Sequence, residues 1–435
     1  MPEAAPAPPG ELSHILVLQL CPIGDTLFGT PALRALRYRY PQARITVVTW
    51  AANREVLAGN PHIHRLVLVR SAFRLPRVLS RLAEENFDAV VGLSNIGSWL
   101  TLFTSFPVRV GFSSQTLGWL YTAQVPDRRD RHAVDYCLDV VAALGALPRG
   151  RHLEIALGEA DREFAARILG PEQAGEIPPL RVAIHPGGRH FPAKRWSVAG
   201  FAEVADYLAG QYGAQVVLVG GPDDVPLAQA IAELCRLAEP VVTAGRSTLK
   251  QTAAILERCD LFVGNDSAPA HLAAAVGTPA VVLFGPTSVD NFGPLGPFDV
   301  VVRRELPCSP CFRWLGGSMQ HLTSLRTLEC NAECMRSITP QAVVAAIERQ
   351  LDRLQLRTTR RLERPAWVAA GLAAAGPGVG LVAGRAEGRP SHRSVFGWRR
   401  LRRPASRRGG LRVLTRLGGS GREPVFHKVQ EFEEL

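Results

Sequence analysis

An acidic residue stands at the first turn between a predicted strand and a predicted helix. Asp25 follows Ile23 and Gly24, shortly after the apolar run 14–20. As a helix N-cap, its carboxylate would face the positive end of the helix dipole and stabilise the helix. As a general base, it would lie at the carboxyl edge of a sheet and accept the proton of an attacking hydroxyl group. The residues around Asp25 fit both interpretations.

A glycine pair and a lysine form a second candidate site. Gly187 and Gly188 follow the apolar run 181–186, and Lys194 comes shortly before a predicted helix. Glycine amides can approach a phosphate closely and lysine adds a point charge, so the combination suits a diphosphate. The spacing differs from the Walker pattern GxxxxGK[ST], which excludes a P-loop. A glycine turn followed by a surface lysine fits these residues equally well.

The third candidate is the segment 264–271, Gly-Asn-Asp-Ser-Ala-Pro-Ala-His. Asp266 and Ser267 come at the start of a predicted helix, and Pro269 falls in its first turn, where proline is favoured. Ser267 and His271 are four residues apart and therefore share one face of that helix. Its N-terminus presents free amides and the positive dipole end, which suits a phosphate or sugar hydroxyls. A buried structural histidine is the alternative interpretation of His271.

Four cysteines lie close together towards the end of the second half of the chain. The pairs Cys308/Cys311 and Cys330/Cys334 have the spacings CxxC and CxxxC. Four thiolates would hold Zn²⁺ tetrahedrally without an open coordination position, so such a site would be structural. Packed free thiols, or a disulfide formed on isolation, are the alternatives. We expect no cofactor and no catalytic metal.

The motifs are embedded in two runs of alternating strands and helices. The first run is predicted to contain strands at 14–20, 45–50, 65–70, 87–93 and 108–112 and helices at 26–40 and 133–145. The second is predicted to contain strands at 181–186, 215–221, 240–245, 260–266 and 279–286 and helices at 198–210, 227–238, 249–259 and 268–277. This alternation predicts parallel βαβ units. We therefore expect an α/β protein with two doubly wound, Rossmann-like domains whose facing strand ends form a ligand cleft.

Length and composition agree with this organisation. The chain has 435 residues, too many for one ordinary domain, and its 46% hydrophobic and 20% charged residues are typical of a globular protein. We predict a disordered leader at 1–12, an N-terminal Rossmann-like domain at 13–175 and a C-terminal Rossmann-like domain at 176–350. An Arg-rich tail at 351–435 is predicted to be disordered.

The net charge of +11 is confined to the tail. Residues 357–435 contain 17 basic and 6 acidic residues, and the rest of the chain contains 33 of each. The tail lacks interleaved aromatic residues, so we expect no specific nucleic-acid partner, while contact with an anionic membrane stays open. No run of about 20 apolar residues is present and the first ten residues do not resemble a secretory signal. We expect a cytoplasmic location.

Three segments together resemble glycosyltransferase family 9, the ADP-heptose:lipopolysaccharide heptosyltransferases. They are ILVLQLCPIGDTLFGTPALRALR near the N-terminus, HPGGRHFPAKRW in the middle and VGNDSAPAHLAAAVGTPAVVLFGPT in the second domain. The stretch CSPCF…CNAECMRSITPQAV at 308–343 is similar to the C-terminal part of that family. The resemblance covers about residues 14–350 and does not extend to the tail.

The resemblance implies a GT-B fold and an inverting, metal-independent sugar transfer. It also implies that the domain at 13–175 lies on the acceptor side and that the domain at 176–350 binds the nucleotide sugar. The donor would be a nucleotide diphosphate sugar such as ADP-heptose, and the acceptor a lipid-linked lipopolysaccharide-core or related glycan at the inner face of the inner membrane. It implies catalysis by Asp25 and binding of donor phosphate by Lys194. It implies further donor contacts by Asp266, Ser267, Ala268 and His271. Two other functions remain as alternatives, a GT-B-fold sugar-nucleotide epimerase and a non-catalytic nucleotide-sugar-binding protein.

The sequence departs from the family pattern at three places. Ala268 stands where a glycine is usual, and Gln19 stands where an arginine is frequent. Gly187 and Gly188 stand where some members have hydroxyl residues. These departures bear on the identity of the sugar more than on the class of reaction.

Overall fold

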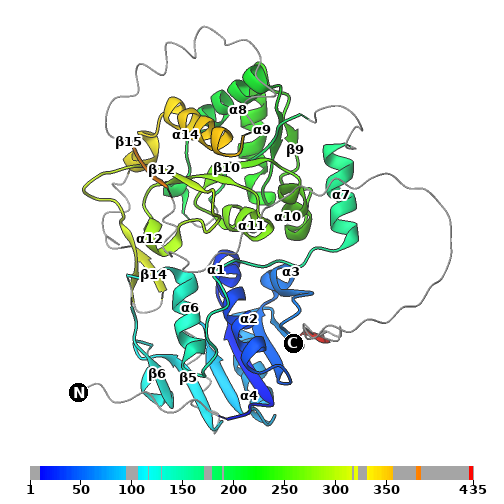
Figure 1. Ribbon diagram of the computed structural model, residues 1–435, viewed down its shortest axis with the longest axis vertical. Helices are drawn as coiled ribbons and strands as arrows, with labels where there is room; N and C mark the ends of the chain where they lie inside the picture. Colours follow the sequence, from blue (N-terminus) through cyan, green and yellow to red (C-terminus); the bar gives the residue numbers. More distant parts are fainter. Residues whose placement is uncertain are drawn as a thin grey trace, which may run out of the picture.

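Two mainly parallel sheets organise the computed structural model (Figure 1). The structure describes residues 10–94, 106–115, 117–128, 130–170, 179–188, 191–315, 318–321, 331–355, 379–383 and 431–434. In spatial order, the first sheet contains β16 (Glu431–Glu434), β3 (Arg65–Val69), β2 (Arg44–Trp50), β1 (His14–Gln19), β4 (Ala89–Gly92), β5 (Val108–Phe112) and β6 (Ala123–Val125). The second contains β15 (Val379–Ala383), β12 (Val300–Arg304), β11 (Ala280–Phe284), β10 (Leu261–Asn265), β7 (Arg181–His185), β8 (Gln215–Leu218) and β9 (Val241–Val242).

Helices flank both sheets, and we call the bodies around the first and second sheets the first half and the second half. The helices of the first half are α1 (Ile23–Phe28), α2 (Thr30–Arg39), α3 (Arg54–Leu57), α4 (Leu75–Ala83) and α6 (Ala133–Ala142). Those that follow are α7 (Glu159–Leu169), α8 (Val198–Tyr212), α9 (Val225–Leu234), α10 (Leu249–Glu257), α11 (Ala268–Val276), α12 (Val289–Phe292), α13 (Glu333–Arg336) and α14 (Pro340–Arg353). A separate antiparallel pair joins β13 (Phe312–Leu315) to β14 (Ser318–His321).

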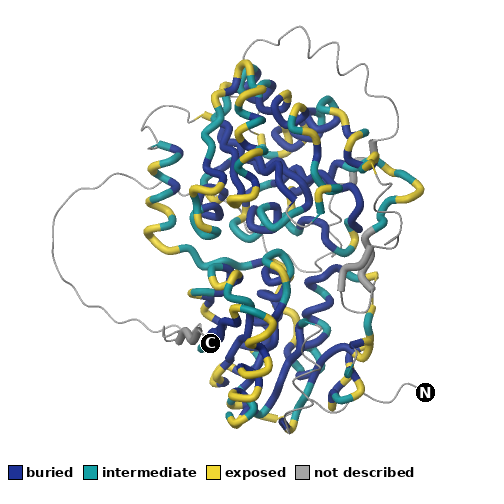
Figure 2. Tube along the Cα trace, turned by 180° about the vertical axis from the view of Figure 1, so that it is seen from behind, coloured by how far each residue is buried: buried dark blue, intermediate teal, exposed yellow. Residues whose placement is uncertain are grey.

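The two doubly wound sheets confirm the predicted fold class. The central strands are buried on both faces, as parallel strands covered by helices must be, and Figure 2 shows buried segments running through each half. Each of the ten predicted strands overlaps a strand of the structure. The predictions missed β6, which is a short strand, and β12, a run of Val and Arg with little alternation that lies between β11 and β15. They also missed the pair β13 and β14.

The predicted helix 26–40 is in fact two helices that meet at Gly29. A Cβ atom at position 29 would lie 1.9 Å from Nε2 of Gln19, so the Gln19 side chain fills the space beside the break. Its Nε2 atom donates a hydrogen bond of 2.8 Å to the Thr26 carbonyl. Pro31, which has no N–H group, falls in the first turn of α2.

Two short segments of the predicted tail form edge strands. β15 pairs antiparallel with β12, and β16 pairs parallel with β3. Disorder therefore does not extend to these segments, because an open sheet edge offers unpaired backbone groups to any strand within reach. The rest of the range 356–435, and residues 1–9 of the leader, lie outside the described residues. α14 ends at Arg353, a few residues beyond the predicted boundary at 350.

The two halves are packed against each other through α1 and α11. A Cβ atom at Gly24 would lie 3.3 Å from Cδ2 of His271, so glycine allows the two helices to approach closely. The Phe28 ring lies 4.4 Å from the His271 ring, measured between centroids. Nε2 of His132 donates a hydrogen bond of 2.9 Å to the Gly293 carbonyl across the same junction. Asp25 on α1 is therefore held beside the start of α11.

α7 packs against α10 of the second half, as Figure 1 shows. Arg162 on α7 forms an ion pair with Glu257 at 2.9 Å, and Nη2 of Arg181 donates a hydrogen bond to the Leu169 carbonyl. The sequence prediction assigned α7 to the N-terminal domain, with a boundary near 175 among residues that the structure does not describe. The contacts place the crossing between the halves before α7, because this helix buries Ala165 and Leu169.

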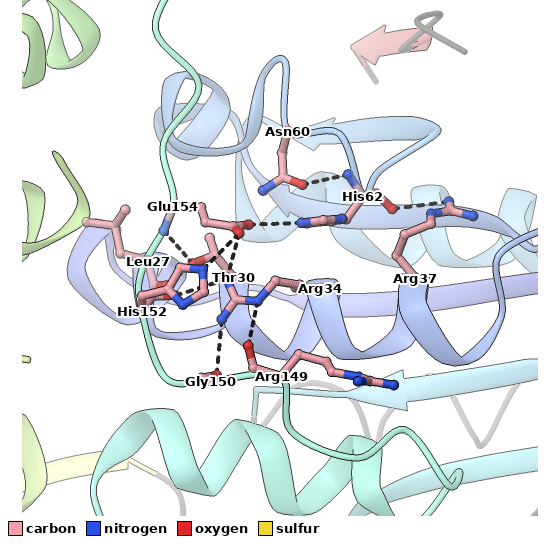
Figure 3. Close-up of polar contacts among 10 residues, drawn as sticks. All are labelled: Leu27, Thr30, Arg34, Arg37, Asn60, His62, Arg149, Gly150, His152 and Glu154. Carbon is pink, nitrogen blue, oxygen red and sulfur yellow. Dashed lines mark hydrogen bonds and ion pairs between the residues drawn. The ribbon is translucent and has the colours of Figure 1, made fainter. Parts of the chain in front are cut away.

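The connecting segment before α7 is fastened to α2 by one buried arginine (Figure 3). Nη1 of Arg34 lies 2.6 Å from Oε1 of Glu154, and Nη2 donates to the Gly150 carbonyl at 3.0 Å. The Glu154 amide donates to the Thr30 hydroxyl at 3.1 Å, and Oε2 of Glu154 lies 3.0 Å from Nε2 of His62. The chain thus leaves the first half along a defined path.

Candidate functional site

Asp25 lies in the first turn of α1, at intermediate exposure. The N-cap interpretation is wrong, because the helix begins at Ile23 and Pro22 occupies the cap position without a side-chain hydrogen bond. In the described part of the chain, no hydrogen bond engages the Asp25 carboxylate. Burial among protein atoms raises its pKa to about 6, the Lys194 charge opposes this shift and the Asp266 charge adds to it. The pKa of Asp25 therefore depends on the charges of Lys194 and Asp266, which both lie in the other half.

Asp266, Lys194 and His271 come together at the end of β10. Nζ of Lys194 lies 2.8 Å from Oδ2 of Asp266, and their side chains are 12% and 4% exposed. Oδ2 also accepts a hydrogen bond of 2.6 Å from the Thr287 hydroxyl. Burial tends to raise the pKa of Asp266, but Lys194, His271 and Thr287 outweigh it, so the pKa lies below its ordinary value. Asp266 is therefore held as an anion.

His271 is buried, and neither of its ring nitrogens makes a hydrogen bond to the described residues. Its Nε2 atom is 3.9 Å from Oδ1 of Asp266, beyond hydrogen-bond distance, and its Nδ1 atom has no partner among the described residues. Burial lowers its pKa to about 4, helped by His132 and Lys194 and opposed by Asp266. The ring is therefore neutral at neutral pH and keeps a free hydrogen-bonding nitrogen.

Ser267 occupies the N-cap position of α11 without a capping hydrogen bond, and its hydroxyl instead lies in a chain of three polar side chains. Its Oγ atom is 2.9 Å from Nδ1 of His185, whose Nε2 atom is 3.2 Å from Oδ2 of Asp224. Ser267 also bonds the Asn265 carbonyl at 3.0 Å. His185 and Asp224 are both buried, so the serine hydroxyl is positioned by groups behind it.

The glycine pair lines this polar chain. A Cβ atom at Gly187 would lie 2.0 Å from Oδ1 of Asp224, so a side chain there would displace the His185–Asp224 pair. A Cβ atom at Gly188 would meet Arg195 at 3.3 Å. Across the junction, the Ala268 backbone is 4.0 Å from a Cβ atom built at Gly24. All predicted donor-site residues therefore converge on the strand ends of β7 and β10 and on the start of α11.

The cysteine cluster is only partly described. Cys308 is exposed, Cys311 is half-buried and Cys334 is buried, whereas Cys330 lies outside the described residues. Within the described ranges, no group of three or more His, Cys, Asp or Glu side chains is arranged to hold a metal ion. The zinc hypothesis stays a prediction.

Sequence reasoning missed three polar side chains of the site. Thr287 holds Asp266, Asp224 holds His185, and His132 bridges the halves. Thr287 stands just after the predicted strand 279–286, at the same sheet edge as Asp266, and this position was a usable signal. The contact between His132 and Gly293 joins residues 161 positions apart and had no local signal.

Two doubly wound domains that meet at their strand ends are the arrangement of the GT-B fold. Residues 76–317 match the family described as glycosyltransferase family 9 (heptosyltransferase). The chain belongs to this family and is a glycosyltransferase, which confirms the resemblance seen in the sequence.

Named relatives and solved structures agree with this assignment. Lipopolysaccharide heptosyltransferase 3 of Escherichia coli K12 is 29% identical over 75% of this chain and 95% of its own length. Lipopolysaccharide heptosyltransferase 2 of Salmonella typhimurium is 30% identical over 66% of this chain and 87% of its own. The glycosyl transferase family 9 structure from Veillonella parvula superposes with a TM-score of 0.64 at 25% identity, covering 79% of this chain and 98% of that one. The GT-B fold is thereby confirmed.

Among the helices described here, none is both long and apolar enough to cross a bilayer.

Proposed function

We propose that this glycosyltransferase moves a heptose-like sugar from a nucleotide diphosphate donor to a lipopolysaccharide-core or related lipid-linked glycan. ADP-heptose is the donor we infer, since one similar structure is that of the ADP-heptose lps heptosyltransferase II of E. coli. The single observation that carries the proposal is the junction of α1 and α11. It brings an unbonded carboxylate, Asp25, to a buried pair of Lys194 and Asp266.

In the proposed reaction, Asp25 takes the proton of the acceptor hydroxyl group while the oxygen of that hydroxyl attacks the anomeric carbon of the donor sugar. The bond between that carbon and the diphosphate oxygen breaks, and the electron pair leaves with the diphosphate. Attack from the side opposite the leaving group inverts the anomeric configuration. A pKa of about 6 suits this role, because the carboxylate is ionised at neutral pH and yet more basic than an ordinary aspartate.

In this proposal, protein groups stabilise the negative charge that develops on the diphosphate. Lys194 uses one ammonium hydrogen for Asp266, and two remain for phosphate oxygens. The free amides at the start of α11 add a partial positive charge at the same place. The proposal therefore requires no metal ion, although a more distant structural neighbour, TibC from enterotoxigenic E. coli, is titled iron-containing.

A transfer assay with ADP-heptose and a lipid-linked core glycan tests the proposal. We expect ADP release only when both substrates are present, a product of inverted anomeric configuration by NMR, and unchanged turnover in EDTA. Isomerised sugar from donor alone would support an epimerase instead, and saturable ADP binding without turnover would support a non-catalytic protein. Loss of turnover in EDTA that iron restores would refute metal independence alone. Lys194→Ala is expected to weaken ADP binding at least tenfold, and an unchanged dissociation constant would remove Lys194 from the donor site.

A further inference from the structure

α3 and α10 meet across the junction of the two halves, beside the contact of α1 with α11 (Figure 1). Oε2 of Glu55 on α3 accepts a hydrogen bond of 3.0 Å from the backbone amide of Lys250 on α10. Nζ of Lys250 donates a hydrogen bond of 2.7 Å to the backbone carbonyl of Ala58, the residue that ends α3. Each half therefore contributes one charged side chain to a helix end of the other half.

Both charged side chains meet backbone groups that the helices themselves leave unpaired. At the start of α10, Thr248 and Gln251 bond each other's amides as a capping box, and the Lys250 amide is bonded by Glu55 instead. A carboxylate is favoured at this positive end of a helix. The carbonyls at the other end of a helix need an outside donor, and the Lys250 ammonium supplies it to Ala58.

The turn after α3 makes room for the lysine. Gly59 has a φ of 80°, in the left-handed region that favours glycine. A Cβ atom at Gly59 would lie 3.3 Å from Cβ of Ala156 in the connecting segment and 3.8 Å from Nζ of Lys250. Glu55, Ala58 and Lys250 are half-buried, so their contacts are partly shielded from water. Shielded contacts of charged groups are stronger than ion pairs on an open surface.

α3 and α10 are also attached to the helices that meet at the site. α3 packs on α1, which carries Asp25, and α10 packs on α11. Nδ2 of Asn53, the residue before α3, donates a hydrogen bond of 2.7 Å to the carbonyl of Cys21, just ahead of α1. A movement of α3 away from α10 would therefore carry α1 away from α11.

We propose that Glu55 and Lys250 form a latch that holds the two halves closed at the junction, and that this latch opens for the nucleotide to enter and leave. Its two hydrogen bonds join residues 195 and 192 positions apart, so they exist only while the halves are in contact. The latch is separate from the cluster of Lys194, Asp266 and His271, so breaking it removes no predicted donor contact. Closure by the latch is independent of the sugar and the acceptor, whereas its link to nucleotide exchange rests on the proposed function.

Hydrogen exchange of the full-length chain without ligand, followed by mass spectrometry, tests the latch. Glu55→Met removes the carboxylate and Lys250→Met removes the ammonium group, and both keep an unbranched side chain. Each variant is expected to speed amide exchange in α1 and α11 about tenfold, because the loss of one hydrogen bond to a charged group shifts an opening equilibrium by at least about that factor. The double variant is expected to speed it about 100-fold.

Two matched controls remove the same kinds of charge without touching the junction. Arg162 on α7 and Glu257 on α10 form an ion pair of 2.9 Å within the second half. Arg162→Met and Glu257→Met therefore disturb α10 but break no contact between α10 and α3. We expect amide exchange in α1 and α11 of both controls to stay within about twofold of the parent.

The pattern of exchange along the chain decides the outcome. Faster exchange confined to α3 and α10 would overturn the proposal, because the two contacts would then be local helix caps. An equal increase in every segment, including the central helix α8, would also overturn it, because the variants would then lower the stability of the whole protein. Parental exchange in α1 and α11 would do the same.

Release of a fluorescent ADP analogue, followed by stopped flow, tests the link to nucleotide exchange. Release is expected to be about tenfold faster in Glu55→Met and in Lys250→Met, because a larger open fraction lets the nucleotide leave more often. Parental release together with faster exchange in α1 and α11 would refute this link. Absence of ADP binding to the parent would refute the proposed function and leave the ligand-free exchange result intact, so the two hypotheses fail separately.

Discussion

Two aspartates from opposite halves meet at one junction and have opposite protonation tendencies. Asp266 in the second half has Lys194 and Thr287 on one oxygen, and its pKa is lowered. Asp25 in the first half has no hydrogen bond from the described residues, and its pKa is raised to about 6. Burial tends to raise the pKa of both carboxyl groups, so burial alone does not explain why the two pKa values shift in opposite directions.

The pKa values of Asp266 and Asp25 differ because a partner of Asp266 comes from its own half, whereas Asp25 meets a cation only from the other half. Asp266 and Thr287 follow neighbouring strands of one sheet, so the Asp266 anion is stabilised by a residue of its own half. Asp25 meets Lys194 only across the junction, and that cation is already bonded to Asp266. We infer that one carboxylate serves to hold a cation in place, while the other is left basic enough to remove a proton.

The largest expected effect is on transfer by Asp25→Asn. We expect kcat to fall by about 10²–10⁴-fold, because a general base contributes about that much to the rate. ADP affinity is expected to stay within twofold, since Asp25 makes no bond in the donor half. Steady-state kinetics and calorimetry measure the two values, with Asp290→Asn, which changes an exposed aspartate on α12, as a control. Undiminished transfer would remove Asp25 from the mechanism.

The same substitution at Asp266 is expected to act mainly on stability. Asp266→Asn leaves Lys194 buried without its partner, and we expect the free energy of unfolding to fall by about 3 kcal/mol. Asp25→Asn is expected to raise the free energy of unfolding by roughly 1–3 kcal/mol at pH 8. Above its raised pKa, the ionised Asp25 destabilises the folded state, and asparagine removes this cost. This gain should vanish below about pH 4. Urea unfolding at pH 4 and pH 8 measures the expected loss of stability in Asp266→Asn and the expected gain in Asp25→Asn. Equal effects of the two variants would contradict the difference between the two aspartates.

The pH dependence of transfer sharpens the comparison. Because Asp25 must be ionised to accept a proton, kcat/KM is expected to fall about tenfold per unit as pH drops below about 6. Asp266 adds no second step near that pH, since its pKa is lowered. A profile measured from pH 4.5 to 8.5 tests this. A flat profile down to pH 4.5 would mean that Asp25 has an ordinary pKa.

A smaller effect is expected at the connecting segment. Hydrogen bonds from His152, His62 and Arg34 outweigh burial and hold the pKa of Glu154 well below its ordinary value. Glu154→Gln is expected to lower the free energy of unfolding by about 1–2 kcal/mol at pH 7. A lowered pKa contributes stability above the unfolded value, so this difference should shrink as pH falls below about 4.5. The exposed Glu159→Gln serves as control in urea unfolding, and a pH-independent difference would contradict the ion-pair explanation.

The smallest expected effect tests the hydroxyl that helps to hold Asp266. Thr287→Val removes one hydrogen bond and keeps the shape, so we expect a loss of about 1 kcal/mol in unfolding free energy. Thr287→Ser keeps the hydroxyl and is expected to retain most of the stability. If Thr287→Val lowered the free energy of unfolding as much as Asp266→Asn does, Thr287 rather than Lys194 would be the main partner of Asp266.

The sequence by itself determined the two α/β halves, the three segments that carry the site and the family. Strand and helix periods repeat over a few residues, so runs such as 14–20 and 261–265 are readable without the fold. The break at Gly29 was not readable, because it depends on the Gln19 side chain ten positions earlier. The early crossing before α7 was hidden for a similar reason, since α7 finds its partner in α10.

Only the tertiary structure decided which charges meet. Lys194 and Asp266 are 72 positions apart, and no local pattern specifies that they pair. The raised pKa of Asp25 arises from α1 packing on α11, which joins residues from the two halves of the protein. A residue's type is written in the sequence, whereas its solvation and its charged neighbours exist only after the halves have packed together.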